Sequence, residues 1–370
     1  MEDKSFDKIL QEFFPKSSKK DWVKMAALET QKKNPIETLS WHGKDDILFL
    51  PYYDPENLAG LDHLKAFHRS SDPSPRPWKN LPAVHVSNER TANHNSLNHL
   101  ALGADGVLFD LTPSAQTDLH ALLQGILLPR VFLALRLNAN TLILNALSDF
   151  IQRESQPALV SGALFWESIP KEGNWDYFLN AHKNFKGLGL IIPAAPPAQL
   201  VCQALLEGVK TFERLAEKSD PEKVFNSISF SVAADASLLE AVAGLRALRM
   251  LWLQVGRAYS QNNYNPADLH LHAHSVAAVD ARYAPRENML KGTYAAMAAI
   301  LGGCDSLTVG DDGTSAVASR WSTNVANIFR YESFFDRIAD AAAGAFAIES
   351  MTDSIAEKAW TLFQQKSRAR

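Results

Sequence analysis

The chain is poor in cysteine and has no long hydrophobic run. Its 370 residues include two cysteines, Cys202 and Cys304, which lie far apart in the sequence. So few thiols argue against a disulfide framework and are typical of reduced, buried side chains in a cytoplasmic protein. The longest apolar runs, such as residues 131–137, have only the length of a strand, so no membrane span is predicted. The N-terminal residues are charged throughout and lack the apolar segment of a signal peptide.

Neither sign of charge dominates, and two common catalytic motifs are missing. There are 37 Lys and Arg against 41 Asp and Glu, a net charge of -4. A near balance gives no reason to expect nucleic acid or a membrane as the main partner. The first apolar run is followed by residues 87–90, Ser-Asn-Glu-Arg, which contain no glycine. The absence of a glycine-rich phosphate turn and of a Gly-x-Ser-x-Gly elbow argues against a dinucleotide-binding sheet and a serine hydrolase.

The sequence pattern changes near residue 80. Residues 1–80 predict an arm: a helix over 6–13, a second helix capped by Ser18, a short strand over 46–51, and an extended linker from 70 to 82. The arm's large apolar residues need a surface to cover, which is either this chain's own barrel or a partner subunit.

Residues 81–370 alternate apolar runs of strand length with segments of helix length. Strands are predicted at 83–87, 106–110, 131–137, 159–165, 188–192, 227–232, 269–274 and 306–309. Helices are predicted at 93–102, 115–125, 138–153, 175–184, 197–216, 236–259, 285–301 and 315–331, with a terminal helix at 353–365. Strand then helix, repeated eight times, predicts an α/β fold of the (β/α)8 (TIM) barrel type.

The main candidate site is the row of histidines His270, His272 and His274 in the seventh predicted strand. Alternate residues of a strand share a face, so all three can point into the barrel. Three imidazoles could bind a transition metal, but the fifth and sixth strands end without a further ligand. Hydrogen-bonded pocket histidines are therefore the favoured interpretation, and His85 in the first strand is expected to be another.

Other polar groups are interpreted as ordinary structure. His94, Asn98 and His99 lie on the first predicted helix and are expected to be exposed. The acidic pair Asp311 and Asp312 precedes a glycine and is typical of a turn.

Three consecutive segments near the C-terminus carry a family resemblance. Residues 288–307, NMLKGTYAAMAAILGGCDSL, are similar to a pattern N..R.T..A.AAVLGG..S; residues 319–333 are similar to S.RIARNTQ.IL.EES; residues 336–353 are similar to RV.DPAGGSYYVE.LTD. These patterns are typical of cobalamin-dependent acyl-CoA mutases, the methylmalonyl-CoA mutase family. Residues 34–41 and 50–53 resemble the opening of its small (beta) subunits, whereas residues 90–220 match in layout only.

The resemblance implies an acyl-CoA-binding barrel, and it also shows departures at the family's active site. Catalytic chains place a Tyr and a His of the sixth strand against the thioester and the corrin; the aligned residues here are Ser231 and Val232. Valine cannot donate a hydrogen bond to a thioester oxygen. In the seventh strand His272 aligns with a pocket histidine of the family, while His270 and His274 replace an arginine and a glutamine. An active barrel also admits acyl-CoA through an axial channel lined by small residues.

Catalytic chains of the family continue into a cobalamin domain with an Asp-x-His-x-x-Gly motif, which does not occur in residues 1–370. We therefore expect no cofactor bound by this chain alone, with adenosylcobalamin belonging to the complex. The resemblance implies a non-catalytic small subunit that consists of the barrel domain and pairs with a homologous large catalytic subunit, with acyl-CoA as a second candidate partner. The alternatives are an active mutase barrel that works with a cobalamin domain on a separate chain, and a metal-dependent barrel hydrolase.

Overall fold

The computed structural model describes residues 18–61, 75–112, 117–139, 141–259, 261, 264–275, 285–310 and 316–369. The predicted helix over 6–13 and the predicted turn at Asp311 and Asp312 lie outside them. Within the described part, one sheet has the order β3-β11-β10-β9-β8-β7-β6-β5-β4, and each neighbouring pair is parallel. Its strands are β3 (Lys79–Asn80), β4 (Ala83–His85), β5 (Gly106–Asp110), β6 (Phe132–Leu137), β7 (Ser161–Trp166), β8 (Phe185–Ile192), β9 (Ile228–Ala234), β10 (His270–Ser275) and β11 (Ser306–Thr308).

The sheet closes because β3 and β4 are two halves of one strand, separated by Leu81 and Pro82. On one side, the Leu81 N–H donates to the Leu307 carbonyl oxygen at 2.8 Å. On the other side, the Pro82 carbonyl oxygen accepts from the Leu108 N–H at 3.0 Å. Proline has no N–H to donate, which accounts for the interruption. The first strand therefore joins the last strand to the second, and the predicted (β/α)8 barrel is confirmed.

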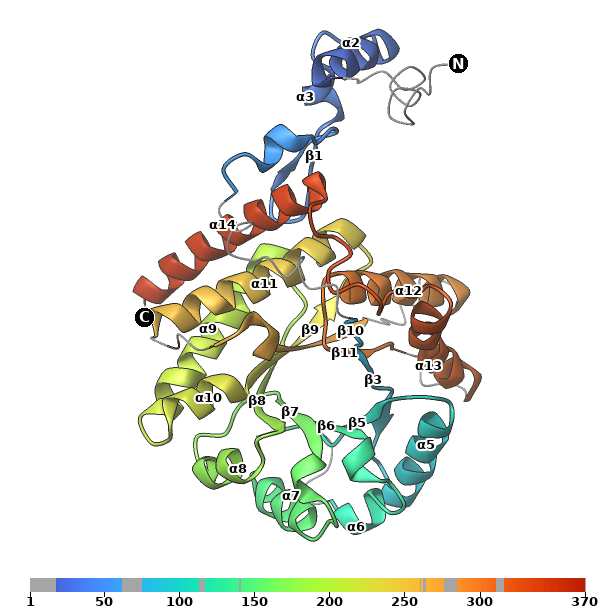
Figure 1. The fold of residues 1–370 in the computed structure, drawn as a ribbon, viewed down its shortest axis with the longest axis vertical. Helices are drawn as coiled ribbons and strands as arrows, with labels where there is room; N and C mark the ends of the chain where they lie inside the picture. Colours follow the sequence, from blue (N-terminus) through green and yellow to red (C-terminus); the bar gives the residue numbers. More distant parts are fainter. Residues whose placement is uncertain are drawn as a thin grey trace, which may run out of the picture.

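Helices surround the sheet (Figure 1). They are α5 (Glu89–Ala101), α6 (Leu119–Leu122), α7 (Leu142–Gln152), α8 (Trp175–Ala181), α9 (Pro197–Ala216), α10 (Pro221–Ser227), α11 (Leu238–Ala258), α12 (Pro285–Leu301), α13 (Ala316–Tyr331) and α14 (Phe346–Arg368), with short 3-10 turns at Leu128–Arg130, Pro157–Leu159 and Pro266–Asp268. The sequence did not predict α10, and α14 begins earlier than predicted. None of the described helices is long and apolar enough to cross a membrane.

The layer between the barrel wall and α11 is filled by aromatic side chains. Trp252 of α11 stacks on Phe225 with ring centroids 4.8 Å apart, and meets Phe230 of β9 edge-on at 5.1 Å. This contact fixes the facing of β9: Phe230 points outward, so its neighbours Ser229 and Ser231 point into the barrel. The two cysteines are buried, as expected, and neither is in a disulfide. Burial raises the pKa of the Cys304 thiol to about 12, so it is not a nucleophile at neutral pH.

The N-terminal arm docks on the barrel through its hairpin. It contains α2 (Lys19–Thr30), α3 (Pro35–Leu39), the strands β1 (Trp41–His42) and β2 (Leu48–Phe49), and a 3-10 turn at Pro55–Leu58. The Lys44 N–H donates to Glu240 of α11 at 2.8 Å, and the Asp45 carboxylate accepts from the Ala198 N–H of α9 at 2.6 Å. As predicted, Ser18 caps α2. Figure 1 shows α2 and α3 projecting away from the barrel, beyond α14.

The arm divides its apolar residues between the barrel and the outside. Phe49 is buried, whereas Met25 and Leu28 on α2 are exposed by 56% and 72%. The predicted linker over 70–82 is wrong for its last residues, because Lys79 and Asn80 pair with β11.

Candidate functional site in the barrel interior

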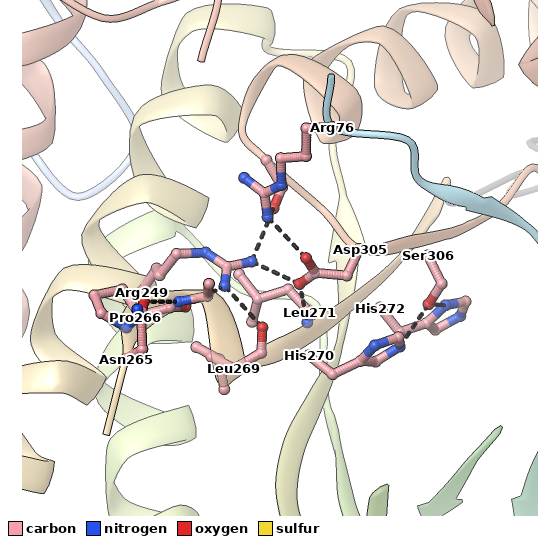
Figure 2. Close-up of polar contacts among 12 residues, drawn as sticks. Arg76, Arg249, Asn265, Pro266, Leu269, His270, Leu271, His272, Asp305 and Ser306 are labelled. Atoms are coloured by element: carbon pink, nitrogen blue, oxygen red, sulfur yellow. Dashed lines mark hydrogen bonds and ion pairs between the residues drawn. The ribbon is translucent and has the colours of Figure 1, made fainter. Parts of the chain in front are cut away.

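The three histidines of β10 face the interior of the barrel. His270 and His272 share one hydroxyl: Ser306 Oγ on β11 lies 2.9 Å from His270 Nε2 and 3.0 Å from His272 Nδ1 (Figure 2). His274 follows on the same face, with its ring centroid 6.2 Å from that of His272. The arrangement agrees with the expected two-residue period of the strand.

Aromatic rings cross the barrel at the level of these histidines. Phe132 of β6 stacks on His270 with centroids 5.3 Å apart and planes at 10°, and Phe165 of β7 stacks on His272 at 4.8 Å. In the order of the closed barrel, β6 and β10 lie four strands apart, so they face each other across the axis. We call these four rings the aromatic bridge.

A glycine makes room for one ring of the aromatic bridge. A Cβ atom at Gly189 of β8 would lie 2.6 Å from the ring of Phe165 and 2.3 Å from the Leu164 carbonyl oxygen. Only glycine allows the backbone and the ring to approach this closely. The Phe165 side chain is thereby directed inward, with 1% of its surface exposed.

Several buried polar atoms beside the aromatic bridge make no hydrogen bond. They are Ser229 Oγ, Ser231 Oγ, His272 Nε2 and His274 Nδ1. Ser231 pairs in register with His272, so the two side chains lie next to each other on the interior face. Val232 lies on the opposite face of β9, with Phe230, and is fully buried. The two residues that align with the family's Tyr and His thus point in opposite directions, and only Ser231 faces the interior.

All three interior histidines are neutral at pH 7. Burial is the main cause, and it lowers the pKa of His270 and of His274 to about 4. Burial and the two flanking histidines lower the pKa of His272 well below its usual value. The guanidinium of Arg136 acts in the same direction on His272 and His274. These imidazoles can donate or accept hydrogen bonds but do not supply a proton at neutral pH.

Polar residues that the sequence analysis missed lie at the mouth of the barrel. Asp110 Oδ2 on β5 lies 3.9 Å from both Arg136 Nη1 on β6 and His85 Nδ1 on β4. The Thr112 hydroxyl donates to Asp110 Oδ1 at 2.7 Å. Asp110 and Arg136 could have been found from the sequence, because each is a charged residue near the end of an apolar run and at a position that faces into the barrel.

The expectation of a hydrogen-bonded pocket histidine at His85 is wrong. Its side chain is 62% exposed and has no hydrogen bond among the described contacts. His85 is the last residue of β4, so it stands at the rim and not in the enclosed part of the barrel.

The opposite end of the barrel is closed by an ion network around Asp305 (Figure 2). Arg249 of α11 donates to Asp305 Oδ2 at 2.6 Å, Arg76 donates to Oδ1 at 2.8 Å, and the Leu271 N–H donates to Oδ2 at 2.8 Å. Burial alone would raise the pKa of Asp305, but the two guanidiniums outweigh burial and hold that pKa well below its usual range. This end carries the amino ends of the strands, the side that stabilises barrels and does not hold their active sites.

One expectation for the first helix is wrong. His94 and Asn98 are exposed as expected, but His99 is buried. His99 Nδ1 lies 2.8 Å from Thr323 Oγ1, and its Nε2 lies 3.1 Å from Ser319 Oγ. The cause is the packing of α5 against α13, which places two hydroxyls opposite this ring.

The described residues contain no group of three or more His, Cys, Asp or Glu side chains placed to hold a metal ion. The three histidines follow one another along β10, and only His270 and His272 share the serine, so the three rings do not converge on one point.

Comparison with known proteins shows which family the chain is similar to. The methylmalonyl-CoA mutase family model matches residues 194–369. Methylmalonyl-CoA mutase of Rhizobium meliloti is 23% identical, over 94% of this chain and 57% of that protein. The methylmalonyl-CoA mutase small subunit of Porphyromonas gingivalis is 25% identical, over 97% of this chain and 64% of that protein. The resemblance to the methylmalonyl-CoA mutase family found in the sequence is thereby confirmed.

Some relatives match a shorter part of the chain at higher identity. The mutase small subunit of Streptomyces virginiae is 33% identical, but only over 47% of this chain and 29% of that protein. This chain spans 57–64% of the length of the mutases of R. meliloti and P. gingivalis. Among solved structures, dihydropteroate synthase of Yersinia pestis is similar at a TM-score of 0.38 and 11% identity, over 71% of this chain and 96% of that one.

Proposed function

We propose that this chain is the non-catalytic small subunit of a heterodimeric methylmalonyl-CoA mutase, an enzyme that interconverts methylmalonyl-CoA and succinyl-CoA by a radical mechanism. Two relatives that carry the name small subunit support this reading. The partner is a homologous large catalytic subunit. The proposed division is an arm over residues 1–80 and a barrel over 81–370, in a cytoplasmic complex.

The aromatic bridge is the observation that carries the proposal. An active barrel of this family takes acyl-CoA along its axis. Here Phe132 and His270, from strands on opposite sides, stack at 5.3 Å and cross that axis. Phe165 packs against His272 beside them. A chain of acyl-CoA width has no straight path between stacked rings, because they are at van der Waals contact.

The residues at the family's active-site positions do not fit the cofactor. The family uses adenosylcobalamin. Here the Ser231 hydroxyl lies inside the barrel without a partner, and Val232 is buried on the outward face of β9. Val232 faces away from the interior and has no hydrogen-bonding group, and the Ser231 side chain is too small to replace a tyrosine ring.

The two alternatives lose support. An active barrel with its cobalamin domain on a separate chain would need the axial path that the aromatic bridge crosses. A metal-dependent hydrolase would need converging ligands, and the described residues offer none.

Under this proposal, the projecting arm is the expected contact surface for the large subunit. Met25 and Leu28 expose large apolar surfaces on α2, away from the barrel. Exposed apolar residues gathered on one element mark protein interfaces.

The test is association with the large mutase subunit of the same organism. Size-exclusion chromatography with light scattering should show a stable one-to-one complex, and Met25→Ser with Leu28→Ser should weaken it. Thr30→Ser, also on α2, is the matched control. Supplied with adenosylcobalamin and a separate cobalamin-domain protein, this chain alone should not turn over methylmalonyl-CoA. Turnover would refute the proposal, and so would the absence of any complex.

A further inference from the structure

The outward face of α13 is apolar, where a surface helix is usually polar. Its inward face is buried and includes Thr323, which contacts His99 of α5. Trp321, Ile328 and Tyr331 lie on the opposite side and are exposed. These positions are seven and three residues apart, so the three side chains form one stripe along the helix. Figure 1 shows α13 on the outside of the barrel, away from the projecting arm.

The turn after α13 adds two apolar side chains to this stripe. Phe334 and Ile338 are exposed, whereas Phe335 turns inward and stacks on Phe329 with ring centroids 5.4 Å apart. The Arg337 N–H donates to the Phe334 carbonyl oxygen at 3.2 Å, which keeps the turn compact. We call the five exposed apolar residues of the helix and the turn the α13 patch: Trp321, Ile328, Tyr331, Phe334 and Ile338.

Phe334 occupies a position where glycine is usual. Its φ is 56°, and the Phe335 N–H donates to the Phe329 carbonyl oxygen at 3.1 Å across the end of the helix. In this type of helix cap the residue before the donor is left-handed and is most often glycine. A phenylalanine there strains the backbone by roughly 1–2 kcal/mol. The Arg337 guanidinium lies 4.0 Å from the ring, yet about half of the ring remains exposed. Strain of this kind gathers at functional surfaces, so the exposed ring points to a contact outside this chain.

The size of the α13 patch matches the apolar part of a protein interface. Each of its side chains exposes 45–63% of its surface. With roughly 200 Å² for a fully exposed aromatic side chain and somewhat less for isoleucine, the α13 patch exposes roughly 500 Å². That area is near the upper limit for a protein that stays monomeric. A standard interface buries about 800 Å² on each partner, somewhat more than half of it apolar.

Two charged residues of opposite sign flank the stripe on α13. Arg320 precedes Trp321 and Glu332 follows Tyr331, and both charged side chains are exposed. Neither has an ion pair among the residues that the structure describes. Glu332 stands at the C-terminal end of the helix, where the helix dipole favours a cation. An antiparallel pair of α13 helices, related by a twofold axis near Ala326, brings Arg320 of one copy opposite Glu332 of the other. The same axis brings Trp321 opposite Tyr331.

We propose that the α13 patch is the contact between two copies of this chain in a symmetric dimer. In such a dimer the same surface of both copies meets, so the apolar stripe covers itself and each charge meets its opposite. This inference goes beyond the proposed function, because the contact with the large subunit is proposed for the arm. Both contacts together give an assembly that contains two copies of each chain.

Size-exclusion chromatography with light scattering on the full chain alone, over a dilution series, measures the dimer. We expect twice the mass of one chain, with a Kd on the order of 1 μM or below. Phe334→Gly removes the ring and relieves the strain, so it should weaken the dimer about tenfold or more while the urea midpoint stays the same or rises. Leu127→Ser changes an exposed leucine before β6 and should leave the dimer unchanged. A monomer at every concentration, or a dimer that Phe334→Gly does not weaken, would overturn the proposal.

A charge exchange tests the twofold axis. Arg320→Glu alone and Glu332→Arg alone each place like charges opposite each other and should weaken the dimer. The double variant pairs the charges again with their signs exchanged and should restore it; no restoration would rule out the antiparallel contact. Met25→Ser with Leu28→Ser, which tests the arm, should leave this dimer intact. If the chain alone is monomeric and Phe334→Gly instead breaks the complex with the large subunit, the α13 patch belongs to that partner and the proposed dimer is wrong.

Discussion

Lowering the pH from 7 to 5 should destabilise this fold, because His270 and His274 are neutral when folded. Their pKa is 6.5 in an ordinary environment and about 4 in the barrel. Between these values the unfolded chain binds more protons than the folded chain, so stability rises with pH in this window. The stability present above pH 6.5 is therefore lost as the pH falls toward 4.

The size of the effect follows from the two pKa values. For one histidine with a pKa of 6.5 unfolded and about 4 folded, the free energy of unfolding falls by roughly 2 kcal/mol between pH 7 and pH 5. Two such histidines give a loss of roughly 4 kcal/mol, a large share of the stability of a typical domain. Asp305 changes the stability of the fold only at lower pH, because the pKa of an aspartate in the unfolded chain is near 4.

Urea denaturation at pH 7, 6 and 5 measures this loss. In the double variant His270→Gln and His274→Gln, which cannot gain these protons, the pH dependence should shrink to less than half that of the parent. His94→Gln removes an exposed histidine and should leave the slope unchanged. An equal slope in the parent and the double variant would refute the reasoning.

Three further changes probe the ion network, the aromatic bridge and the arm. Asp305→Asn leaves the buried guanidinium of Arg249 without its carboxylate and should cost about 3–5 kcal/mol in urea denaturation; a loss under 1 kcal/mol would contradict the network. Phe165→Ala should cost about 3–5 kcal/mol by opening a cavity, whereas Phe165→Leu should cost less. Asp45→Ala removes the carboxylate that accepts from the Ala198 N–H and should cost about 1 kcal/mol. Limited proteolysis should then cut the arm faster, and unchanged cleavage would show that the hairpin is held by other contacts.

The strands of the barrel were predictable because parallel strands are buried on both faces and appear as unbroken apolar runs. The run 131–137 illustrates this, and β6 occupies residues 132–137. The short helix α10 directly precedes β9, and its residues show no apolar periodicity of their own. The sequence therefore did not predict it. The first strand was located only in part, since Pro82 divides it into two short pieces.

The site was predictable only where one strand contains it. The common face of His270, His272 and His274 follows from their spacing alone. The aromatic bridge does not, because the inward facing of Phe132 and Phe165 depends on the register between strands. The partners of Asp305 were hidden for another reason: Arg76 lies 229 residues away in the sequence, and no local pattern joins them.

The divided first strand has a consequence for the order of folding. Leu81 and Leu307 are hydrogen-bonded neighbours in the closed barrel, yet nearly the whole barrel sequence lies between them. Contacts between such distant residues form late, because closing a long loop costs chain entropy before the contact is made. Until β11 has been synthesised, the free edge of β3 is exposed to neighbouring chains. The last strand synthesised is thus the one that removes the open edge, and until then the growing protein is exposed to edge-to-edge aggregation.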